Sequence, residues 1–304
     1  MRKVLVTGGT GFIGRHSLSV LLEHGWKVHA LTIDSPILEH RHLLWHQVDL
    51  MNYPQVARVI ADVRPEALLH FAWYAVPHKY WTSMENLSWV SASINLFREF
   101  AGQGGKRMVA AGTCAEYDWS YGFCSENVTP CKPTSLYGIS KRATQQVLSA
   151  SAKEIGLSFA WGRIFFLYGP YEHPERLVAY VIRSLLKGEI AKVSSGNQVR
   201  DFLHVSDVGN AFVALLESEV QGAVNISSGR PVALRELILE IARLQGNQDL
   251  VQFNAAQMQS GEPPLLVGDS RRLQDEVGWK PRYNLEEGLG QTISWWKGHL
   301  EVCR

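Results

Sequence analysis

The sequence predicts an α/β protein with a doubly wound parallel sheet and a smaller C-terminal lobe. Three observations support this fold class. Short apolar runs alternate with longer segments of helical period up to residue 165, and this alternation is typical of β-α-β units. A glycine-rich turn follows the first apolar run directly. After Gly169 and Pro170 the alternation becomes irregular, which indicates a second structural unit.

The expected elements follow from these runs in chain order. Short apolar runs predict strands at Val4–Val6, Val28–Leu31, Ala67–Phe71, Met108–Ala111 and Phe159–Phe165. Segments of helical period predict helices at Phe12–His24, Asn86–Phe100 and Tyr137–Ile155. In the C-terminal part, the pattern predicts helices at 178–188 and 232–246 and a strand near Lys192–Ser194.

Composition and charge narrow the class of protein. The chain has 304 residues, of which 46% are hydrophobic, so it can bury a large core without disulfides. Its 30 basic and 29 acidic residues give a net charge of +1, which argues against a global attraction to nucleic acid or to acidic membranes. Cys114, Cys124, Cys131 and Cys303 lack paired spacing, as expected of reduced thiols in a cytoplasm. No apolar run forms a signal peptide core or reaches a membrane span of about 18 residues.

The stretch TGGTGFIG at residues 7–14 follows the first predicted strand and precedes the first predicted helix. Glycines at Gly8, Gly11 and Gly14 allow a tight turn and a close approach of the backbone to a pyrophosphate. The N-terminus of the following helix then faces the phosphates. The pattern predicts a dinucleotide site, and the alternative is a tight turn without a ligand.

The end of the second predicted strand normally selects between NAD and NADP, because an acidic side chain there accepts hydrogen bonds from the adenosine ribose of NAD. Thr32 falls at this place, with Asp34 two residues later. Thr32 would not repel a 2′-phosphate, but no arginine follows it, so NADP is slightly favoured over NAD. Asp49 suits a carboxylate that receives the adenine amino group, and a helix N-cap at Asn52 is the compatible alternative.

Tyr137 and Lys141 in YGISK are four residues apart, so both side chains project from one face of a helix. A phenol has a pKa of about 10 and becomes an acid-base group near neutral pH only when a nearby cation favours its anion. Lys141 can supply that cation and can also bind a ribose. Thr113 offers a hydroxyl where the fourth predicted strand ends. The alternative for YGISK is a solvated helix face.

Several motifs occur together in a fixed order. They are TGGTGFIG, Asp49, HFAW (70–73), Asn86, Thr113, YGISK, RIFFLYGP (163–170), RDFLHVSDV (200–208) and DSRRLQDEVGWKP (269–281). In this order they resemble the extended short-chain dehydrogenase/reductases, in particular the nucleotide-sugar epimerase/dehydratase/reductase family. The resemblance implies an NAD(P)-binding Rossmann domain at 1–165 that is rejoined by about 200–222. It implies a substrate-binding lobe made of 166–199 and 223–304.

The resemblance also implies roles for individual residues. The implied cofactor contacts are Gly8, Gly11, Phe12, Ile13, Gly14, Thr32, Asp49, Leu50, Ala72, Trp73, Tyr137, Lys141, Ile164 and Phe165. The implied catalytic triad is Thr113, Tyr137 and Lys141. Besides Thr113, the implied substrate contacts are Arg176 and Leu177 near the nucleotide and Arg200 at the sugar diphosphate. The helices that contain Asn86 and Tyr137 pair across a homodimer in this family, so we expect a dimer.

The sequence departs from the family pattern at two places. Phe166 stands where relatives commonly carry an asparagine that contacts the diphosphate. Cys114 and Ala115 follow Thr113, whereas 4,6-dehydratases carry acidic residues there to move a proton and eliminate water. Glu116 is one position too late and would point the other way on an extended backbone. We therefore do not expect dehydration.

Other residues have both a functional and a structural interpretation. A metal site at His40, His42 and His46 is less favoured than an exposed segment near the adenosine end, and no metal is expected. Cys114 with His173 could serve C3/C5 epimerisation, but a small buried thiol is the stronger interpretation. Aromatic residues could line a sugar pocket, although each alone fits core packing better; they are Trp73, Tyr74, Tyr80, Trp81 and Trp89.

These observations lead to one expected function and two alternatives. The first is NAD(P)-dependent reduction of a nucleotide-activated 4-keto-6-deoxy sugar at C4, with Tyr137 as the proton donor, Thr113 orienting the oxygen and Lys141 lowering the tyrosine pKa. The alternative is a nucleotide-sugar 4-epimerase with tightly bound NAD. A catalytically silent dinucleotide sensor is a third, less favoured hypothesis. The expected partner is a small nucleotide sugar, with neither nucleic acid nor a membrane.

Overall fold

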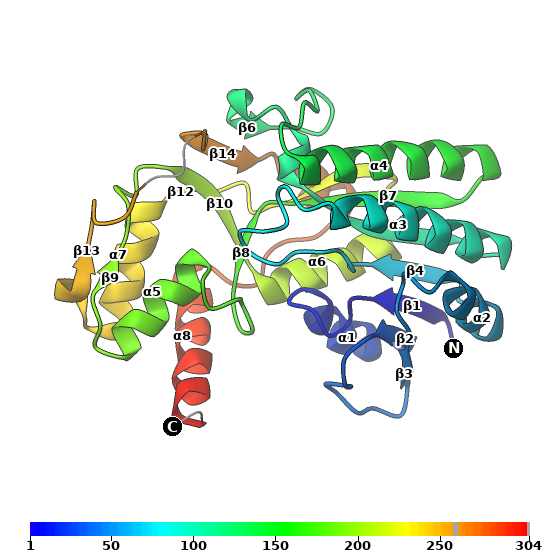
Figure 1. The fold of residues 1–304 in the computed structure, drawn as a ribbon, viewed down its shortest axis with the longest axis horizontal. Coiled ribbons are helices and arrows are strands. Elements are labelled where there is room, and N and C mark those ends of the chain that lie inside the picture. The colour runs from blue at the N-terminus through cyan, green and yellow to red at the C-terminus, as the bar shows by residue number, and fades with distance from the viewer. Residues whose placement is uncertain (258–260, 303–304) are drawn as a thin grey trace.

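A computed structural model describes residues 1–257 and 261–302. Its larger part is built on a seven-stranded sheet in the order β11-β7-β5-β4-β1-β2-β3 (Figure 1). All neighbouring strands in it are parallel. The strands are β1 (Lys3–Thr7), β2 (Lys27–Thr32), β3 (Leu43–Gln47), β4 (Ala67–His70), β5 (Arg107–Thr113), β7 (Ser158–Ile164) and β11 (Gly222–Ile226). The strand order reverses beside β1, and sheets of this kind bind ligands in a crevice outside the carboxyl ends of the strands at such a reversal, which here are β1 and β4.

Helices cover both faces of this sheet. One face carries α1 (Gly14–Glu23) and α6 (Val205–Glu217), and the other carries α2 (Tyr53–Val63), α3 (Glu85–Gly102) and α4 (Leu136–Ile155) (Figure 1). Side chains alternate between the two faces along each strand, and because helices cover both faces, the central strands are buried and largely apolar on both sides, whereas the edge strand β3 is partly exposed.

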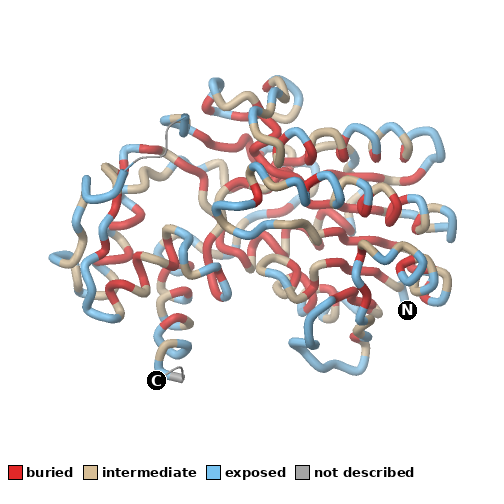
Figure 2. Tube along the Cα trace, in the orientation of Figure 1, coloured by how far each residue is buried: buried red, intermediate tan, exposed pale blue. Residues whose placement is uncertain are grey.

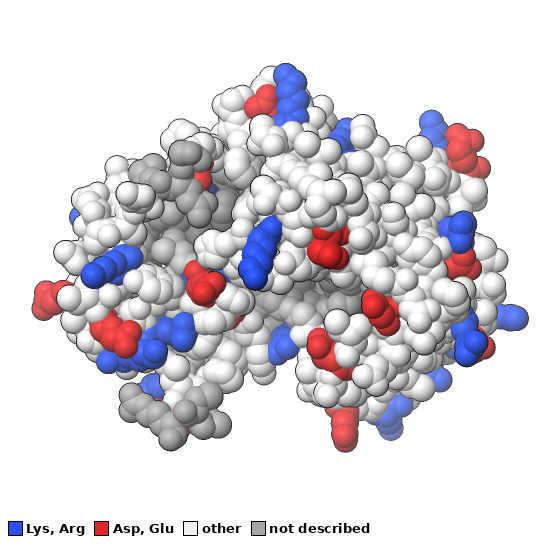
Figure 3. Space-filling model, in the orientation of Figure 1, with Lys and Arg blue, Asp and Glu red and all other residues white. Residues whose placement is uncertain are grey.

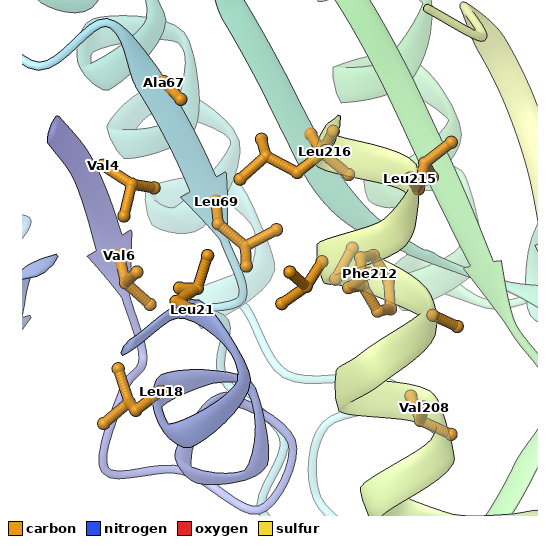
Figure 4. Packing of buried hydrophobic residues seen from close by; sticks show 14 of the residues in the cluster. Val4, Val6, Leu18, Leu21, Ala67, Leu69, Val208, Phe212, Leu215 and Leu216 are labelled. Carbon is orange, nitrogen blue, oxygen red and sulfur yellow. The ribbon is translucent and has the colours of Figure 1, made fainter. Parts of the chain in front are cut away.

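The alternation along β1 shows how the two cores form. Val4 and Val6 belong to the cluster that includes Leu18 of α1 and Phe212 of α6 (Figure 4). Leu5, between them in sequence, belongs to the opposite cluster under α2, α3 and α4. All five side chains are fully buried. Figure 2 shows the buried segments running through the middle of the molecule.

The smaller lobe contains two further sheets and three helices, packed around an apolar cluster of its own. The first sheet has the order β12-β10-β14-β6, with β8 also paired to β10, and the second pairs β13 with β9. The strands are β6 (Phe123–Cys124), β8 (Phe166–Tyr168), β9 (Ala191–Lys192), β10 (Val199–His204), β12 (Pro231–Ala233), β13 (Val251–Gln252) and β14 (Leu265–Gly268). The helices are α5 (Leu177–Leu186), α7 (Leu234–Gln245) and α8 (Leu285–Val302), and the short turns are η1 (Cys114–Glu116), η2 (Trp119–Tyr121), η3 (Gln248–Leu250) and η4 (Arg272–Glu276).

The fold class predicted from the sequence is confirmed. The structure differs from the sequence prediction in the segment that returns to the large part and in one edge strand. The chain rejoins the large part with α6 and β11, which extends the returning segment to Ile226, while β10 at 199–204 pairs within the smaller lobe. The edge strand β3 was not expected, because the three histidines around Leu43–Gln47 give it no clear apolar period.

The surface shows no single dominant charge. Side chains of both signs are scattered over the face in Figure 3, in agreement with the net charge of +1. Within residues 1–257 and 261–302, no helix has the length and apolar character needed to cross a bilayer.

Candidate active site

The loop between β1 and α1 is shaped by positions where a side chain does not fit. Gly8 has a φ of +70°, and a Cβ there would lie 2.9 Å from the backbone nitrogen of Ala72. A Cβ on Gly14 would lie 2.1 Å from the carbonyl oxygen of Gly8. The amide of Gly11 donates to that same carbonyl at 3.0 Å. The loop therefore brings bare backbone and the start of α1 to the crevice, as a pyrophosphate-binding turn requires.

A carboxylate lies beside this loop at the end of β2. Thr10, in the glycine loop, donates to Asp34 Oδ2 at 3.2 Å, and the Asp34 amide donates to Thr32 Oγ1 at 2.9 Å. Asp34 is exposed, whereas the side chain of Thr32 is buried. An acidic group thus lies just after β2, two residues later than the usual position of the residue that accepts from the adenosine ribose.

The segment that the sequence predicted to flank adenine follows β3. Asp49 is exposed, and its Oδ1 accepts from the Met51 amide at 2.9 Å. Leu50 is buried in the core under α2. Asn52 is the N-cap of α2 and accepts from the Gln55 amide at 3.3 Å, so the structural alternative considered for this segment is present. The N-cap at Asn52 does not use the Asp49 side chain, and Asp49 Oδ2 has no described hydrogen bond.

Thr113 is the last residue of β5, at the carboxyl edge of the sheet. Its Oγ1 accepts from the Ala115 amide at 3.2 Å, and its own amide donates to Glu116 Oε1 at 2.9 Å. Cys114, Ala115 and Glu116 form the turn η1, so the backbone after Thr113 is not extended as the sequence argument assumed. The capping arrangement turns Glu116 inward, under Thr113.

Glu116 is completely buried and forms an ion pair with Arg163 of β7, with Nε and Oε2 2.9 Å apart. Its Oε1 also accepts from Trp161 Nε1 at 2.8 Å. The carboxylate is therefore surrounded by donors from β5 and β7, and it supports the strand end rather than facing the crevice. Sequence reasoning did not identify this pair, because Arg163 lies 47 positions away from Glu116.

Tyr137 lies at the start of α4, where Ser135 caps the helix by accepting from the Gly138 amide at 3.1 Å. The Tyr137 amide donates to the Trp81 carbonyl at 3.2 Å, and the Tyr80 ring meets the Tyr137 ring edge-on at 4.8 Å. Burial raises the pKa of Tyr137, and a hydrogen bond with Thr113 partly offsets this rise. The structure thus brings the predicted hydroxyl and phenol together.

Lys141 is almost completely buried one turn further along α4. Its Nζ donates to the Ala111 carbonyl of β5 at 2.9 Å and lies 3.9 Å from the ring centroid of Trp73. Burial lowers the pKa of Lys141 to about 7, and the Glu116 carboxylate partly opposes this shift. A lysine in this setting can change its charge near neutral pH.

The predicted substrate residues lie in two different environments. Arg176 is an exposed residue that precedes α5, and its guanidinium lies 5.6 Å from the ring centroid of Tyr80. Leu177 is the first residue of α5. Arg200 is buried in β10, where its guanidinium donates to the Pro263 carbonyl at 2.8 Å and lies 3.4 Å from Glu262. The Tyr80 ring lies between Arg176 and Tyr137 and contacts both, so Arg176 is near the candidate triad. The guanidinium of Arg200, in contrast, is already paired with Glu262.

The remaining predicted residues line the same edge of the sheet. Ala72 follows β4 and its amide donates to Thr7 Oγ1 at 3.2 Å, while Phe12 and Ile13 belong to the glycine loop. Ile164 ends β7, and Phe165 is buried against Cys114 and Tyr117. Phe166 starts β8, and its ring lies 5.3 Å from the Arg200 guanidinium.

Aromatic residues surround the candidate triad. Trp81 contacts Tyr80 at 4.6 Å, Tyr137 at 5.7 Å and Trp119 at 6.2 Å between ring centroids. Sequence reasoning considered Tyr80 and Trp81 for a sugar pocket but preferred core packing. Their contacts with Tyr137 show that they form one wall of the candidate site. The sequence could not predict these contacts, because Tyr80 and Trp81 are far from Tyr137 along the chain.

A doubly wound sheet with a glycine loop after its first strand, and with Thr113, Tyr137 and Lys141 beside that loop, defines a dinucleotide-binding protein of the short-chain dehydrogenase type. The chain belongs to the NAD dependent epimerase/dehydratase family, whose model matches residues 4–227. This match confirms the resemblance that the motifs indicated.

Known proteins of this family are similar over nearly the whole chain. UDP-glucuronic acid decarboxylase 1 of Xenopus tropicalis is 29% identical over 99% of this chain and 73% of its own length. The structure of UDP-glucose 4-epimerase from Thermotoga maritima with UDP-glucose is 26% identical, with a TM-score of 0.85 over 98% of this chain and 99% of that one. UDP-glucose 4-epimerase of Thermus thermophilus, in complex with NAD, is 27% identical, with a TM-score of 0.84 over 97% of this chain and 99% of that one.

Proposed function

We propose that this protein catalyses reversible hydride transfer at C4 of a nucleotide sugar and acts as a 4-epimerase. The observation that carries the proposal is the grouping of Thr113, Tyr137 and Lys141 beside the glycine loop, where Lys141 donates to β5 and the Thr113 side chain partly offsets the rise in the pKa of Tyr137. The loop fits a dinucleotide, because Gly8 and Gly14 pack so tightly against neighbouring backbone that a Cβ would clash there, and this tight turn brings the start of α1 to the strand end. Bound NAD would supply the hydride acceptor and donor.

The protein groups have complementary tasks at the C4 oxygen. Tyr137 takes the proton of the C4 hydroxyl when the carbon is oxidised and returns it on reduction. Thr113 orients that oxygen through its hydroxyl. Lys141, as an ammonium ion, favours the phenolate of Tyr137 and donates to a cofactor ribose. The same tasks serve a 4-epimerase and a 4-ketoreductase.

The residues after Thr113 argue against dehydration. The second position after it is Ala115, which has no acidic group, and the carboxylate of Glu116 is held by Arg163 and Trp161. Releasing that carboxylate into the crevice would leave a buried arginine without its partner, at a cost of several kcal/mol. Proton removal at C5 therefore lacks a base from η1.

Two solved 4-epimerases, which are 26% and 27% identical to this chain, support epimerisation over the 4-keto-6-deoxy sugar reduction that the sequence placed first. Reductase activity stays a prediction. The consumption of the nicotinamide cofactor distinguishes a 4-epimerase from a 4-ketoreductase. An epimerase purifies with tightly held NAD and interconverts C4 epimers without net nicotinamide consumption, whereas a reductase consumes NADH or NADPH.

The experiment combines the purified protein with a panel of UDP-, GDP-, CDP- and dTDP-linked sugars, including 4-keto-6-deoxy forms. Products and nicotinamide absorbance are followed together. We expect epimer formation at constant absorbance, and Tyr137→Phe should lose it by about 100-fold or more. Full turnover of Tyr137→Phe, or absorbance loss with every accepted sugar, would overturn the 4-epimerase proposal.

For the cofactor we propose NAD rather than NADP, in contrast to the slight preference drawn from Thr32. The Asp34 carboxylate lies against Thr10 of the pyrophosphate loop, where it can accept from ribose hydroxyls and would repel a 2′-phosphate. Asp34→Asn should raise the affinity for NADP relative to NAD by about threefold to tenfold. Asp49→Asn is the matched control and should leave that ratio unchanged. An unchanged ratio in Asp34→Asn would contradict the assignment.

A homodimer through α3 and α4 also remains a proposal. These helices pack side by side, and they expose the apolar side chains of Leu87, Ile139 and Val147. Sedimentation velocity over a range of concentrations tests it, and a monomer at every concentration would exclude the dimer. The cytoplasmic location predicted from the cysteines is likewise a proposal.

A further inference from the structure

The ammonium group of Lys141 has an unusual set of neighbours for a buried charge. The side chain has 4% of its surface exposed, and its described hydrogen-bond acceptor is one neutral group, the Ala111 carbonyl. Two indole rings lie close to it, that of Trp73 with its centroid at 3.9 Å and that of Trp161 at 5.7 Å. A cation at such a distance from an indole face is attracted by the electrons of the ring.

None of the described ionisable groups around Lys141 gives its ammonium group a paired negative charge, as the next contacts show. Glu116 of η1 acts on it from a distance but is already paired with Arg163 of β7. His70 of β4 has its two ring nitrogens bonded to Thr7 and Ser93, and burial lowers its pKa to about 3, so the ring is neutral. Burial raises the pKa of Tyr137 on the same helix, which favours its neutral form. Within the described part of the chain, no carboxylate lies within ion-pair distance of Lys141 Nζ.

The Trp73 ring is held in its position by a chain of hydrogen bonds. Its Nε1 donates to Asn86 Oδ1 at 2.9 Å. Asn86 is completely buried, and its amide nitrogen donates to the carbonyls of Tyr80 at 2.7 Å and Ser83 at 2.8 Å. The Asn86 side chain therefore has its donors fixed by the loop before α3, and its oxygen is left to hold the indole. This arrangement fixes the ring that lies 3.9 Å from Lys141.

We propose that Trp73 is a positioning residue that keeps Lys141 charged in the candidate active site by presenting its indole face to the ammonium group, with Asn86 as the anchor of the indole. Trp73 acts through Lys141, and its effect on activity rests on the proposed function, in which the ammonium form is the active form. Its effect on the protonation of Lys141 does not depend on any substrate or cofactor.

The proposal predicts a shift in a titration. Burial lowers the pKa of Lys141, and the indole face opposes this shift because it stabilises the charged form alone. Removing the ring should lower the titration midpoint further, by about one pH unit. An aromatic replacement should retain part of the effect, because the electron-rich face remains although the bond to Asn86 is lost.

The experiment measures the protonation of Lys141 directly in the full-length protein without cofactor. The Cε resonances of 13C-labelled lysine are followed against pH by NMR, and the Lys141 signal is assigned by its loss in Lys141→Met. We expect Trp73→Leu to lower the midpoint by about one unit and Trp73→Phe to restore at least half of that shift. Trp119→Leu is the matched control, since its ring contacts Trp81 rather than Lys141, and should leave the midpoint unchanged. Equal midpoints in the wild type and Trp73→Leu would overturn the proposal.

A second measurement separates this proposal from the proposed function. Once a turnover assay exists, the alkaline limb of the pH profile should fall at a lower pH in Trp73→Leu and return toward the wild type in Trp73→Phe. A shifted NMR titration with an unshifted pH profile would support the indole effect and contradict the catalytic role of the ammonium form. Thermal unfolding of each variant verifies that it is folded, and a misfolded Trp73→Leu leaves Trp73→Phe, whose midpoint should still fall below that of the wild type.

Discussion

Two buried charged groups lie close together under the candidate active site, and they are stabilised in opposite ways. The Glu116 carboxylate has an arginine, an indole N–H and a backbone amide as partners. The Lys141 ammonium has one backbone carbonyl and two aromatic faces. The carboxylate has a cation and neutral donors around it, whereas a lysine without a carboxylate partner can exchange its proton near neutral pH. The difference separates the group that supports the site from the group that, in the proposed function, takes part in its chemistry.

The largest effect that tests this comparison concerns stability. Arg163→Met leaves the Glu116 carboxylate buried without its charged partner and should lower the free energy of unfolding by about 3–5 kcal/mol. Urea denaturation measures it. The double variant Glu116→Gln/Arg163→Met removes both charges and should recover much of the loss. Unaltered stability in Arg163→Met would show that the pair does not support the strand end.

Replacement of Lys141 should separate stability from activity. Its pKa falls from 10.5 to about 7 on folding, so the unfolded chain binds more protons between these values and stability rises with pH across that window. The cost of the buried charge is complete below the folded pKa. We expect Lys141→Met to be more stable than the wild type by roughly 1–3 kcal/mol near pH 6, with a smaller difference near pH 10.

The same Lys141→Met variant should lose turnover by about 100-fold, because Tyr137 then lacks a neighbouring cation. Unfolding curves at both pH values and a turnover assay measure the two effects. If Lys141→Met were less stable than the wild type at pH 6, Lys141 would be a group that stabilises the fold, as Glu116 is.

Trp161 touches both groups and gives the smallest expected effect. Its N–H donates to Glu116, and its ring lies 5.7 Å from Lys141. Trp161→Phe should cost about 1–2 kcal/mol of stability, because the carboxylate loses one donor while Arg163 remains. The Lys141 titration should change less than in Trp73→Leu. A larger titration shift in Trp161→Phe would transfer the main cation–π role to Trp161.

The sequence predicted the parts of the molecule that depend on local pattern. The glycine loop was predicted from its local spacing between a strand and a helix, and the contact of Gly14 with the Gly8 carbonyl is local, although Gly8 also avoids a clash with Ala72 in the distant loop after β4. Tyr137 and Lys141 share a face through helix geometry alone. The fold class followed in the same way from alternating apolar and helical segments.

What the sequence did not predict depends on contacts between distant segments. The Glu116–Arg163 pair joins β7 to the turn after β5, and the assumption of extended backbone after Thr113 hid the inward turn of Glu116. The anchoring of Trp73 by Asn86 joins the end of β4 to α3. Asp34 reaches Thr10 only because β2 ends beside the glycine loop. Strand register and turn geometry set these contacts, and neither leaves a periodic signal in the sequence.

The short strand β6 limits how this protein could be recombined with its relatives. It belongs to the connection between Thr113 and Tyr137, yet it pairs with β14 of the smaller lobe. A chimera that exchanged only 166–199 and 227–302 would pair β6 with a strand from the other protein, and would so alter the connection between Thr113 and Tyr137, the residues proposed to be catalytic. The smallest transferable unit therefore includes 114–135 as well, so sequence comparisons aimed at specificity are best made on these three segments together.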